Sequence, residues 1–261
     1  MDLAQARHAF ITGGASGIGL GIADTLAARG LRVTIADIND DALATVLAER
    51  GDNFRGVVLD TRDRAGWARA RDEAEAAFGP VDVLVNNAGI APNGQGFAEM
   101  DPDSFDRILA INLVGVFNGV QAFAAGMKAR GRGHIVNTSS QAGLVATVRG
   151  VGAYAVAKYG VTALTESLSL EMGGSGVGVT LLCPGYVQTN LAANTARVGG
   201  DRREFTGQMP PSEVSSADVG AMVVEAIEAD RLYCMTHPGV WATIEKRMGP
   251  LREAALLREP G

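Results

Sequence analysis

The stretch HAFITGGASGIGL, residues 8–20, decides the fold of this chain. An apolar run of strand length, residues 8–12, leads directly into Gly13, Gly17 and Gly19, and a helical pattern follows them. Glycine lets the backbone turn tightly and approach an anion, and a helix start adds free N–H groups and the positive end of the helix dipole. The stretch therefore predicts a cradle for a pyrophosphate group between a first strand and a first helix.

Apolar runs alternate with amphipathic stretches along most of the chain. This alternation predicts a parallel sheet with helices on both faces, and right-handed crossovers make it doubly wound. We expect one α/β domain over residues 1–261, with about seven strands. The expected strands are 8–12, 31–36, 54–59, 81–85, 133–138, 177–182 and 232–235. The expected helices are the stretch through 28, then 40–50, 64–78, 102–129, 154–172, 217–229 and 240–257.

Residues 186–216 have weaker periodicity, with many polar residues, glycines and prolines. Insertions that follow the strands of a doubly wound sheet lie near the binding crevice. We expect a substrate lid over 186–216, and an ordinary surface loop is the alternative.

The composition narrows the class of protein. The 261 residues include 29 acidic and 23 basic side chains, for a net charge of −6, which argues against nucleic acid or an anionic membrane as the main partner. Cys183 and Cys234 lie far apart without metal-ligand or redox spacing, so we expect them to be reduced and buried, and we expect no metal site. There is no signal-peptide pattern and no apolar run that we expect to span a membrane, which favours a cytoplasmic protein.

An acidic residue, Asp37, ends the second expected strand. A carboxylate at this position can accept hydrogen bonds from the hydroxyls of an adenosine ribose, and it repels a 2′-phosphate. The sequence thus favours NAD over NADP, and Ser16 agrees because it brings no positive charge. The alternative is that Asp37 only caps a helix that begins at Asn39 or Asp40.

Two further strand ends carry candidate cofactor residues. Asp60 and Thr61 follow the third strand, where an acid can hold an adenine amino group or simply form a turn. Asn86-Asn87-Ala88-Gly89 ends the fourth strand, where the amides can border the cofactor or tie neighbouring strands together, and Gly89 allows close approach.

Tyr154 and Lys158 are four residues apart on an expected helix, so their side chains share one face. A free tyrosine has a pKa of about 10, too high for efficient base catalysis near neutrality. A neighbouring ammonium stabilises the phenolate and lowers that pKa. The pair therefore predicts a proton-transfer site, in which Lys158 can also hold ribose hydroxyls.

Two polar positions support that site. Ser139 and Ser140 end the fifth strand, where a hydroxyl can hold a substrate oxygen beside the tyrosine. Asn112 is an isolated amide in the long helix expected over 102–129. It can kink that helix and hold a water that links Lys158 to solvent, or it can be a buried amide with structural partners only.

Taken together, these motifs resemble the short-chain dehydrogenase/reductase family over roughly residues 8–190. The resemblance rests on Thr12-Gly13-(x3)-Gly17-x-Gly19, Asn86-Asn87-Ala88-Gly89, Asn112, Ser140, Tyr154-(x3)-Lys158 and Pro184-Gly185-(x3)-Thr189. It implies a Rossmann fold with a seven-stranded sheet and a catalytic group of Asn112, Ser140, Tyr154 and Lys158. It also implies that the nicotinamide is bordered by Pro184, Gly185, Val187 and Thr189, while the glycine turn with Ser16 and Ile18 holds the rest of the cofactor with Asp37, Asp60, Thr61, Asn87, Ala88 and Gly89.

Two departures from the family pattern concern the serine and the C-terminus. Ser140 precedes Tyr154 by one residue more than in many members, so Ser139 stays a minor alternative. The C-terminus lacks the glycine-rich final strand and tail that pack subunits in many family tetramers. We expect a homo-oligomer, either a tetramer or a dimer through the two long helices that begin near Pro102 and Tyr154.

The expected reaction is NAD-dependent interconversion of a secondary alcohol and a ketone, with Tyr154 as general acid and base. The candidate substrate residues are mostly apolar, which favours an uncharged substrate with an aryl or alicyclic group. These candidates are Gln141, Leu144, Val145, Val148 and Tyr186, with Arg149 as the one charged neighbour. His237 can touch substrate or lie in a surface turn. The alternatives are a 3-oxoacyl thioester reductase, which Asp37 and the net charge oppose, and a non-catalytic NAD-binding sensor.

Overall fold

The computed structural model describes residues 1–199 and 213–256, and its centre is a sheet of seven parallel strands. The strand order is β3-β2-β1-β4-β5-β6-β7, so the doubly wound α/β fold is confirmed. The strands are β1 (His8–Thr12), β2 (Arg32–Asp37), β3 (Phe54–Val58), β4 (Val83–Asn86), β5 (Gly133–Thr138), β6 (Val177–Cys183) and β7 (Tyr233–Met235).

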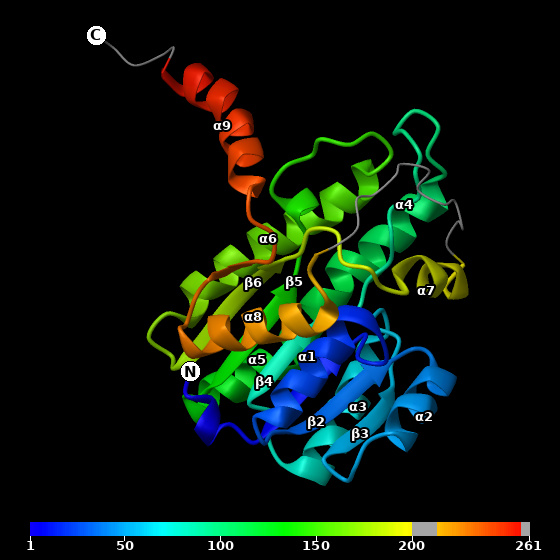
Figure 1. The fold of residues 1–261 in the computed structure, drawn as a ribbon, viewed down its shortest axis with the longest axis vertical. Coiled ribbons are helices and arrows are strands. Elements are labelled where there is room, and N and C mark those ends of the chain that lie inside the picture. The colour runs from blue at the N-terminus through cyan, green and yellow to red at the C-terminus, as the bar shows by residue number, and fades with distance from the viewer. Residues whose placement is uncertain (200–212, 257–261) are drawn as a thin grey trace.

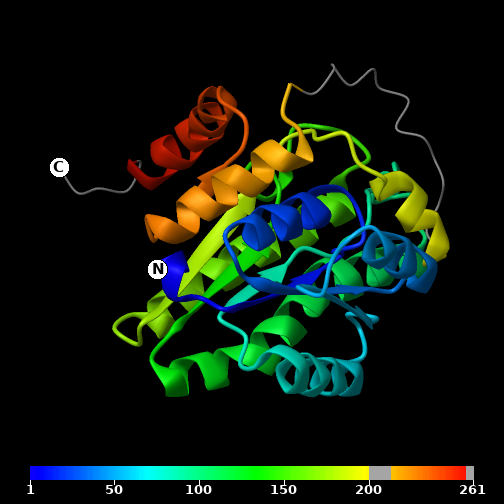
Figure 2. The same cartoon turned by 60° about the horizontal axis from the view of Figure 1, so that its bottom comes forward.

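Helices cover both faces of the sheet (Figures 1 and 2). One face packs against α1 (Gly17–Ala28), α2 (Asp40–Ala48) and α8 (Ser216–Glu228). The other face packs against α3 (Arg64–Phe78), α5 (Gly115–Arg130) and α6 (Gly152–Met172). The remaining described α-helices are α4 (Pro102–Leu109), α7 (Leu191–Arg197) and α9 (Val240–Leu256). Both layers bury apolar side chains against strands that are buried on both faces, as parallel sheets require.

The position of the site follows from the point in the sheet where the strand order reverses, between β1 and β4. In register, Ile11 of β1 pairs with Ile35 of β2 on one side and with Val85 of β4 on the other. The connections from β1 and β4 therefore leave in opposite directions, and a crevice opens beyond the carboxyl ends of these strands.

The helix expected over 102–129 is interrupted in the structure. α4 ends at Leu109, a π-helical segment runs from Ala110 to Val114, and α5 begins at Gly115. Contrary to our expectation for apolar runs, the stretch 102–130 is long and apolar enough by composition to cross a bilayer. Its most apolar window is 56% buried, and it packs against α3, α6 and the sheet, as a core helix does.

The expected lid contains a helix that the sequence pattern did not predict. α7 occupies part of 186–216, while residues 200–212 of the expected lid lie outside the described residues. The two cysteines are free and buried, as predicted. Burial raises the pKa of Cys183 to about 12 and that of Cys234 to about 11, so both stay thiols near neutrality.

Candidate active site

The glycine turn between β1 and α1 requires glycine for its backbone and for its contacts. Gly13 and Gly17 have φ values of +63° and +53°, in the left-handed region that favours glycine. A Cβ at Gly13 would lie 3.0 Å from the Cα of Ala88, and a Cβ at Gly19 would overlap the carbonyl oxygen of Gly13. Glycine at these positions therefore lets the turn pack closely on itself and on the segment after β4, beside the N-terminus of α1, where an anion can bind.

The carboxyl ends of β1 and β4 are fastened together by one hydroxyl and one amide. The hydroxyl of Thr12 accepts hydrogen bonds from the backbone N–H groups of Asn87 (2.9 Å) and Ala88 (3.1 Å). The side-chain amide of Asn87 donates to the carbonyl of Thr12 at 3.1 Å. Asn87 and Ala88 are thereby fixed against the glycine turn, so Asn87 ties two strands together while it borders the crevice.

Asp37 lies at the end of β2 and faces the glycine turn. Its carboxylate accepts from the backbone N–H groups of Ala15 (3.3 Å) and Asn39 (3.1 Å). The side chain that caps α2 is that of Asn39, which accepts from the backbone of Ala42. The alternative that Asp37 only caps this helix is therefore wrong.

Asp60 is paired with Arg62. The Arg62 guanidinium donates to both carboxylate oxygens, the shortest bond being 2.6 Å, and this hydrogen bonding lowers the pKa of Asp60. The backbone N–H of Arg62 also donates to Asp60 at 3.0 Å, so Asp60 forms the turn that we considered as its alternative role. Its neighbour Thr61 is buried, and its carbonyl accepts from the side chains of Trp67 and Asn118.

A cavity of about 80 Å³ lies among these residues. The side chain of Asn194, from α7, borders it and donates to the hydroxyl of Ser16 at 3.1 Å. α7 thus reaches from the segment after β6 to the glycine turn. The residues that line the cavity are Gly13, Ala36, Asp37, Ile38, Leu59, Asp60, Thr61, Ala88, Gly89, Ile90, Ile111, Asn194 and Val198.

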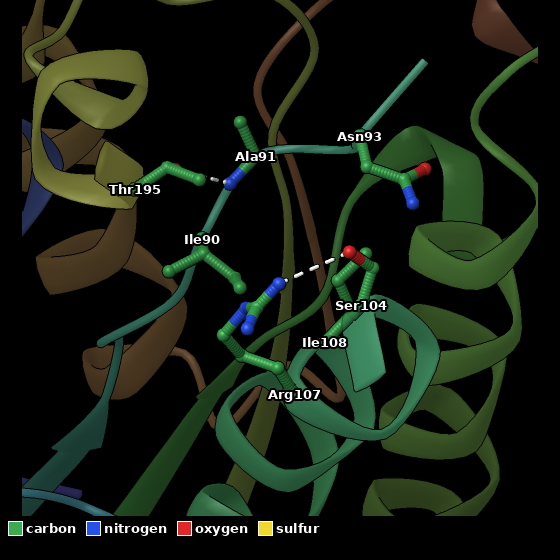
Figure 3. Close-up of a pocket in the computed structure, with 7 residues that line it drawn as sticks. All are labelled: Ile90, Ala91, Asn93, Ser104, Arg107, Ile108 and Thr195. Carbon is green, nitrogen blue, oxygen red and sulfur yellow. Dashed lines mark hydrogen bonds between the residues drawn. The ribbon is translucent and has the colours of Figure 1, made fainter. Parts of the chain in front are cut away.

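A smaller cavity lies next to it, between α4, α7 and the segment after β4 (Figure 3). The backbone N–H of Ala91 donates to the hydroxyl of Thr195 at 2.9 Å, and Arg107 donates to Ser104 at 3.0 Å. The Ala91–Thr195 hydrogen bond holds α7 beside the crevice, in addition to the bond between Asn194 and Ser16. Nothing in the sequence pattern singled out Asn194 or Thr195, because a single amide or hydroxyl in an irregular segment carries no periodic signal.

Tyr154, in the first turn of α6, meets Ser140 at the end of β5. The Ser140 hydroxyl lies close enough to the Tyr154 hydroxyl to lower its pKa, and Ser140 also accepts from the backbone of Ala142 at 3.1 Å. Ser139 is buried and turned the other way, since its hydroxyl donates to the carbonyl of Lys158 at 2.8 Å. The geometry therefore brings Ser140, and not Ser139, to the tyrosine.

Lys158 lies one helical turn after Tyr154 and is only 3% exposed. Its Nζ donates to the carbonyl of Thr138 at 2.8 Å and lies 5.6 Å from the centroid of the Tyr154 ring. Burial lowers the pKa of Lys158 to about 8. Burial also raises the pKa of Tyr154, and the nearby hydroxyl of Ser140 opposes that change. The direction is thus opposite to the expected lowering of the tyrosine pKa by Lys158, because desolvation of the hydroxyl is the largest cause of the change.

Asn112 lies within the π-helical segment and is fully buried. Its side-chain oxygen accepts from the backbone N–H of Ile90 (2.7 Å), and its amide donates to the carbonyl of the same residue (3.0 Å). These are structural partners, as one of our two alternatives expected. A Cβ placed on Gly89 would lie 3.0 Å from this oxygen and 3.8 Å from the Nζ of Lys158, so Gly89 leaves open the space between the two groups. The role of Asn112 in holding a water stays a prediction.

The segment after β6 returns to the glycine turn. The Cβ of Thr189 would be 3.0 Å from a Cβ at Gly17, and Val187 is buried. The backbone N–H of Gly185 lies 3.2 Å from Nδ1 of His237, and the carbonyl of Pro184 accepts from Gln141. His237 therefore lies against this segment, at the start of the half-exposed turn over 237–239, and its contact with substrate stays a prediction.

The candidate substrate residues divide into two groups. Val148 and Tyr186 are exposed, with 50% and 41% of their surface accessible. Val145 is buried, and Leu144 packs against the core of α6 and β6, so contact of these two side chains with substrate stays a prediction. Gln141 begins the short turn after Ser140 and stays partly exposed.

A nicotinamide dinucleotide fits this arrangement of residues. The side-chain-free positions of the glycine turn and Gly89, the N-terminus of α1 and the carboxylate of Asp37 meet at one cavity. The Nζ of Lys158 lies 3.8 Å from a Cβ placed on Gly89, which lines the same cavity. The family model described as short chain dehydrogenase matches residues 7–198.

The chain belongs to the short-chain dehydrogenase/reductase family. It is 42% identical over 185 residues to a 3-alpha-(or 20-beta)-hydroxysteroid dehydrogenase of Mycobacterium tuberculosis, which covers 71% of this chain and 70% of the relative. It is 38% identical over 235 residues to 3beta-hydroxysteroid dehydrogenase 2 of Eggerthella lenta, covering 82% and 90%. A short-chain dehydrogenase/reductase from Burkholderia phymatum, solved in complex with NAD, superposes with a TM-score of 0.87 at 32% identity and covers 100% of this chain and 98% of its own. As a family member, this chain is an oxidoreductase with a site for a nicotinamide cofactor.

Proposed function

We propose that this enzyme interconverts a secondary alcohol and a ketone with NAD, and that the hydroxyl of its substrate stands on an apolar alicyclic ring. The observation that carries the proposal is the closeness of the Ser140 and Tyr154 hydroxyls beside the buried ammonium of Lys158. Two hydroxyls that meet at the end of a strand can both reach one substrate oxygen, and one of them can transfer its proton. The names of two relatives, both hydroxysteroid dehydrogenases, support an alicyclic alcohol as substrate.

Tyr154, Ser140 and Lys158 would each have a separate role in the reaction. When bound, the cofactor accepts or gives the hydride, while the protein supplies position and electrostatics. Tyr154 as phenolate takes the proton of the alcohol, and Ser140 donates a hydrogen bond to the same substrate oxygen. With a pKa of about 8, Lys158 is largely charged at neutral pH, and its charge favours the phenolate over the neutral tyrosine.

The cofactor would be held by the other half of the crevice. The glycine turn and Ser16 are placed for the pyrophosphate, and Asp37 for the ribose hydroxyls of the adenosine. A carboxylate there disfavours the 2′-phosphate of NADP, which supports NAD as the preferred cofactor. Pro184, Gly185, Val187 and Thr189 would border the nicotinamide.

The test is turnover, followed by nicotinamide absorbance, with a panel of alicyclic, aryl and aliphatic secondary alcohols and with either cofactor. Tyr154→Phe should lower kcat by about 10²- to 10⁴-fold, the range for loss of a general acid or base, while cofactor binding persists. Tyr159→Phe is the matched control, because it removes a hydroxyl from the same helix and keeps the ring that Arg247 contacts. Equal turnover of the two variants would contradict the role of Tyr154. Cofactor binding without any turnover would favour the sensor.

A further inference from the structure

Helix α9 is a surface element whose apolar side chains lack cover in the described structure. It extends away from the sheet and its covering helices (Figure 1), and none of its residues is buried. Trp241 is 65% exposed, Met248 48% and Leu251 51%. Its anchor to the body is the guanidinium of Arg247, 5.3 Å from the centroid of the Tyr159 ring in α6.

The apolar side chains of α9 form one stripe, in which Ile244 is half-buried and the others are exposed. The apolar residues are spaced three and four apart, which is the repeat of a helix that packs along another helix. They are Trp241, Ile244, Met248, Leu251 and Ala255. We call these five residues the α9 stripe; in heptad terms, Trp241, Met248 and Ala255 take position a, and Ile244 and Leu251 take position d.

The interior of α9 argues that the helix needs a partner. Gly249 and Pro250 lie in its middle, and both residues disfavour a helix that is held by its own hydrogen bonds alone. A helix of 17 residues with this interruption gains most of its stability from packing of an apolar face. Both residues occupy positions b and c of the heptad, away from the α9 stripe, so they do not obstruct a partner.

The charges beside the stripe identify the partner. In an antiparallel pair of identical helices, position e of one helix faces position e of the other. Glu245 and Arg252 both occupy position e, and the register that stacks Met248 on Leu251 and Ile244 on Ala255 of the second helix also sets Glu245 opposite Arg252 twice. A parallel pair would instead set Arg247 against Arg252, with like charges.

We propose that α9 is a docking surface for a second copy of this chain, with two α9 helices packed antiparallel along the α9 stripe. This contact is separate from the proposed reaction and from the α4–α6 surface that we expected to join subunits. It also uses the extension that replaces the glycine-rich tail of many family members. Each subunit brings the same helix, so the pair closes on itself as a two-fold dimer.

The test is sedimentation equilibrium of the full chain over a range of concentrations. Arg252→Glu should raise the dissociation constant of this contact roughly tenfold, because two opposite-charge pairs become two like-charge pairs. If another interface also joins subunits, Arg252→Glu should reduce the mass of the assembly by half. Lys246→Glu is the matched control, since it makes the same charge change at position f, outside the pair, and should leave the assembly unchanged.

The double variant Glu245→Arg/Arg252→Glu restores opposite charges in the exchanged order and should regain the wild-type assembly. Equal assembly of Arg252→Glu and Lys246→Glu would overturn the proposal, and so would a double variant that remains as weak as Arg252→Glu. A flotation assay with phosphatidylserine-containing vesicles tests the alternative that the amphipathic helix α9 binds a membrane surface. A monomer that floats with the vesicles would overturn the proposal in favour of a membrane surface.

Discussion

Replacement of Lys158 by methionine should stabilise the fold at neutral pH while it removes activity. Lys158 is buried, and its pKa falls from the usual 10.5 to about 8. At about 1.4 kcal/mol for each pH unit, that difference corresponds to about 3 kcal/mol, which the fold loses by keeping a charged ammonium out of water. Between pH 8 and 10.5 the unfolded chain retains a proton that the folded chain has released, so the stability attributable to Lys158 rises with pH over this window.

The assay is urea unfolding of the wild type and of Lys158→Met at pH 7 and again near pH 10.5. The quantity to follow is the free energy of unfolding of the wild type minus that of the variant. Its change between the two pH values isolates the ionisation of Lys158, because the lost hydrogen bond to Thr138 and the altered packing are present at both pH values. We expect the wild type to gain about 2–3 kcal/mol relative to the variant across this range. A difference that stays constant with pH, or that moves in the opposite direction, would refute the reasoning.

Three further predictions concern the serines, the glycines and the cofactor. Ser140→Ala should lower kcat by about 10- to 10³-fold with little loss of stability. Ser139→Ala should instead lower the free energy of unfolding in urea by about 1–3 kcal/mol, because it removes a buried hydroxyl with partners in α6. The reverse pattern would exchange the roles of the two serines. Gly19→Ala should abolish NAD binding in a fluorescence titration, while Gly126→Ala, in the exposed face of α5, should leave binding intact and stabilise by up to about 1 kcal/mol. Asp37→Ser should shift the ratio of kcat/KM for NAD over NADP at least about tenfold toward NADP, as expected from the loss of one charge near a phosphate, and an unchanged ratio would separate this carboxylate from cofactor choice.

The sequence was sufficient for features with a repeating or fixed pattern. Strands buried on both faces appear as apolar runs, so all seven were predicted within about two residues, and the glycine turn was visible because its position requires glycine. The site residues that belong to a spacing, such as Tyr154 and Lys158, were found in the same way.

Features that depend on contacts between distant segments were not predictable. The partner of Asp60 is Arg62, and the fastening of α7 to Ser16 and Ala91 joins residues more than 100 positions apart in the chain. The direction of the Tyr154 pKa was also missed, because the spacing to Lys158 reports proximity along a helix and says nothing of how much water the hydroxyl loses. The π-helical turn around Asn112 has the same origin, since it accompanies hydrogen bonds to Ile90 on a different segment.

The connections that hold the carboxyl ends of the central strands together are made of amides and hydroxyls. Thr12 bonds the segment after β4, and Asn86 donates to Asn137, which in turn donates to Thr165 of α6. None of these groups gains or loses a proton in water at any pH the protein would meet. The proposed reaction releases a proton in one direction and takes one up in the other, so the scaffold would keep its shape while the charge beside it changes. A pH profile of turnover would then report on the chemistry of Tyr154 and Lys158 themselves, undisturbed by loosening of the strands that carry them.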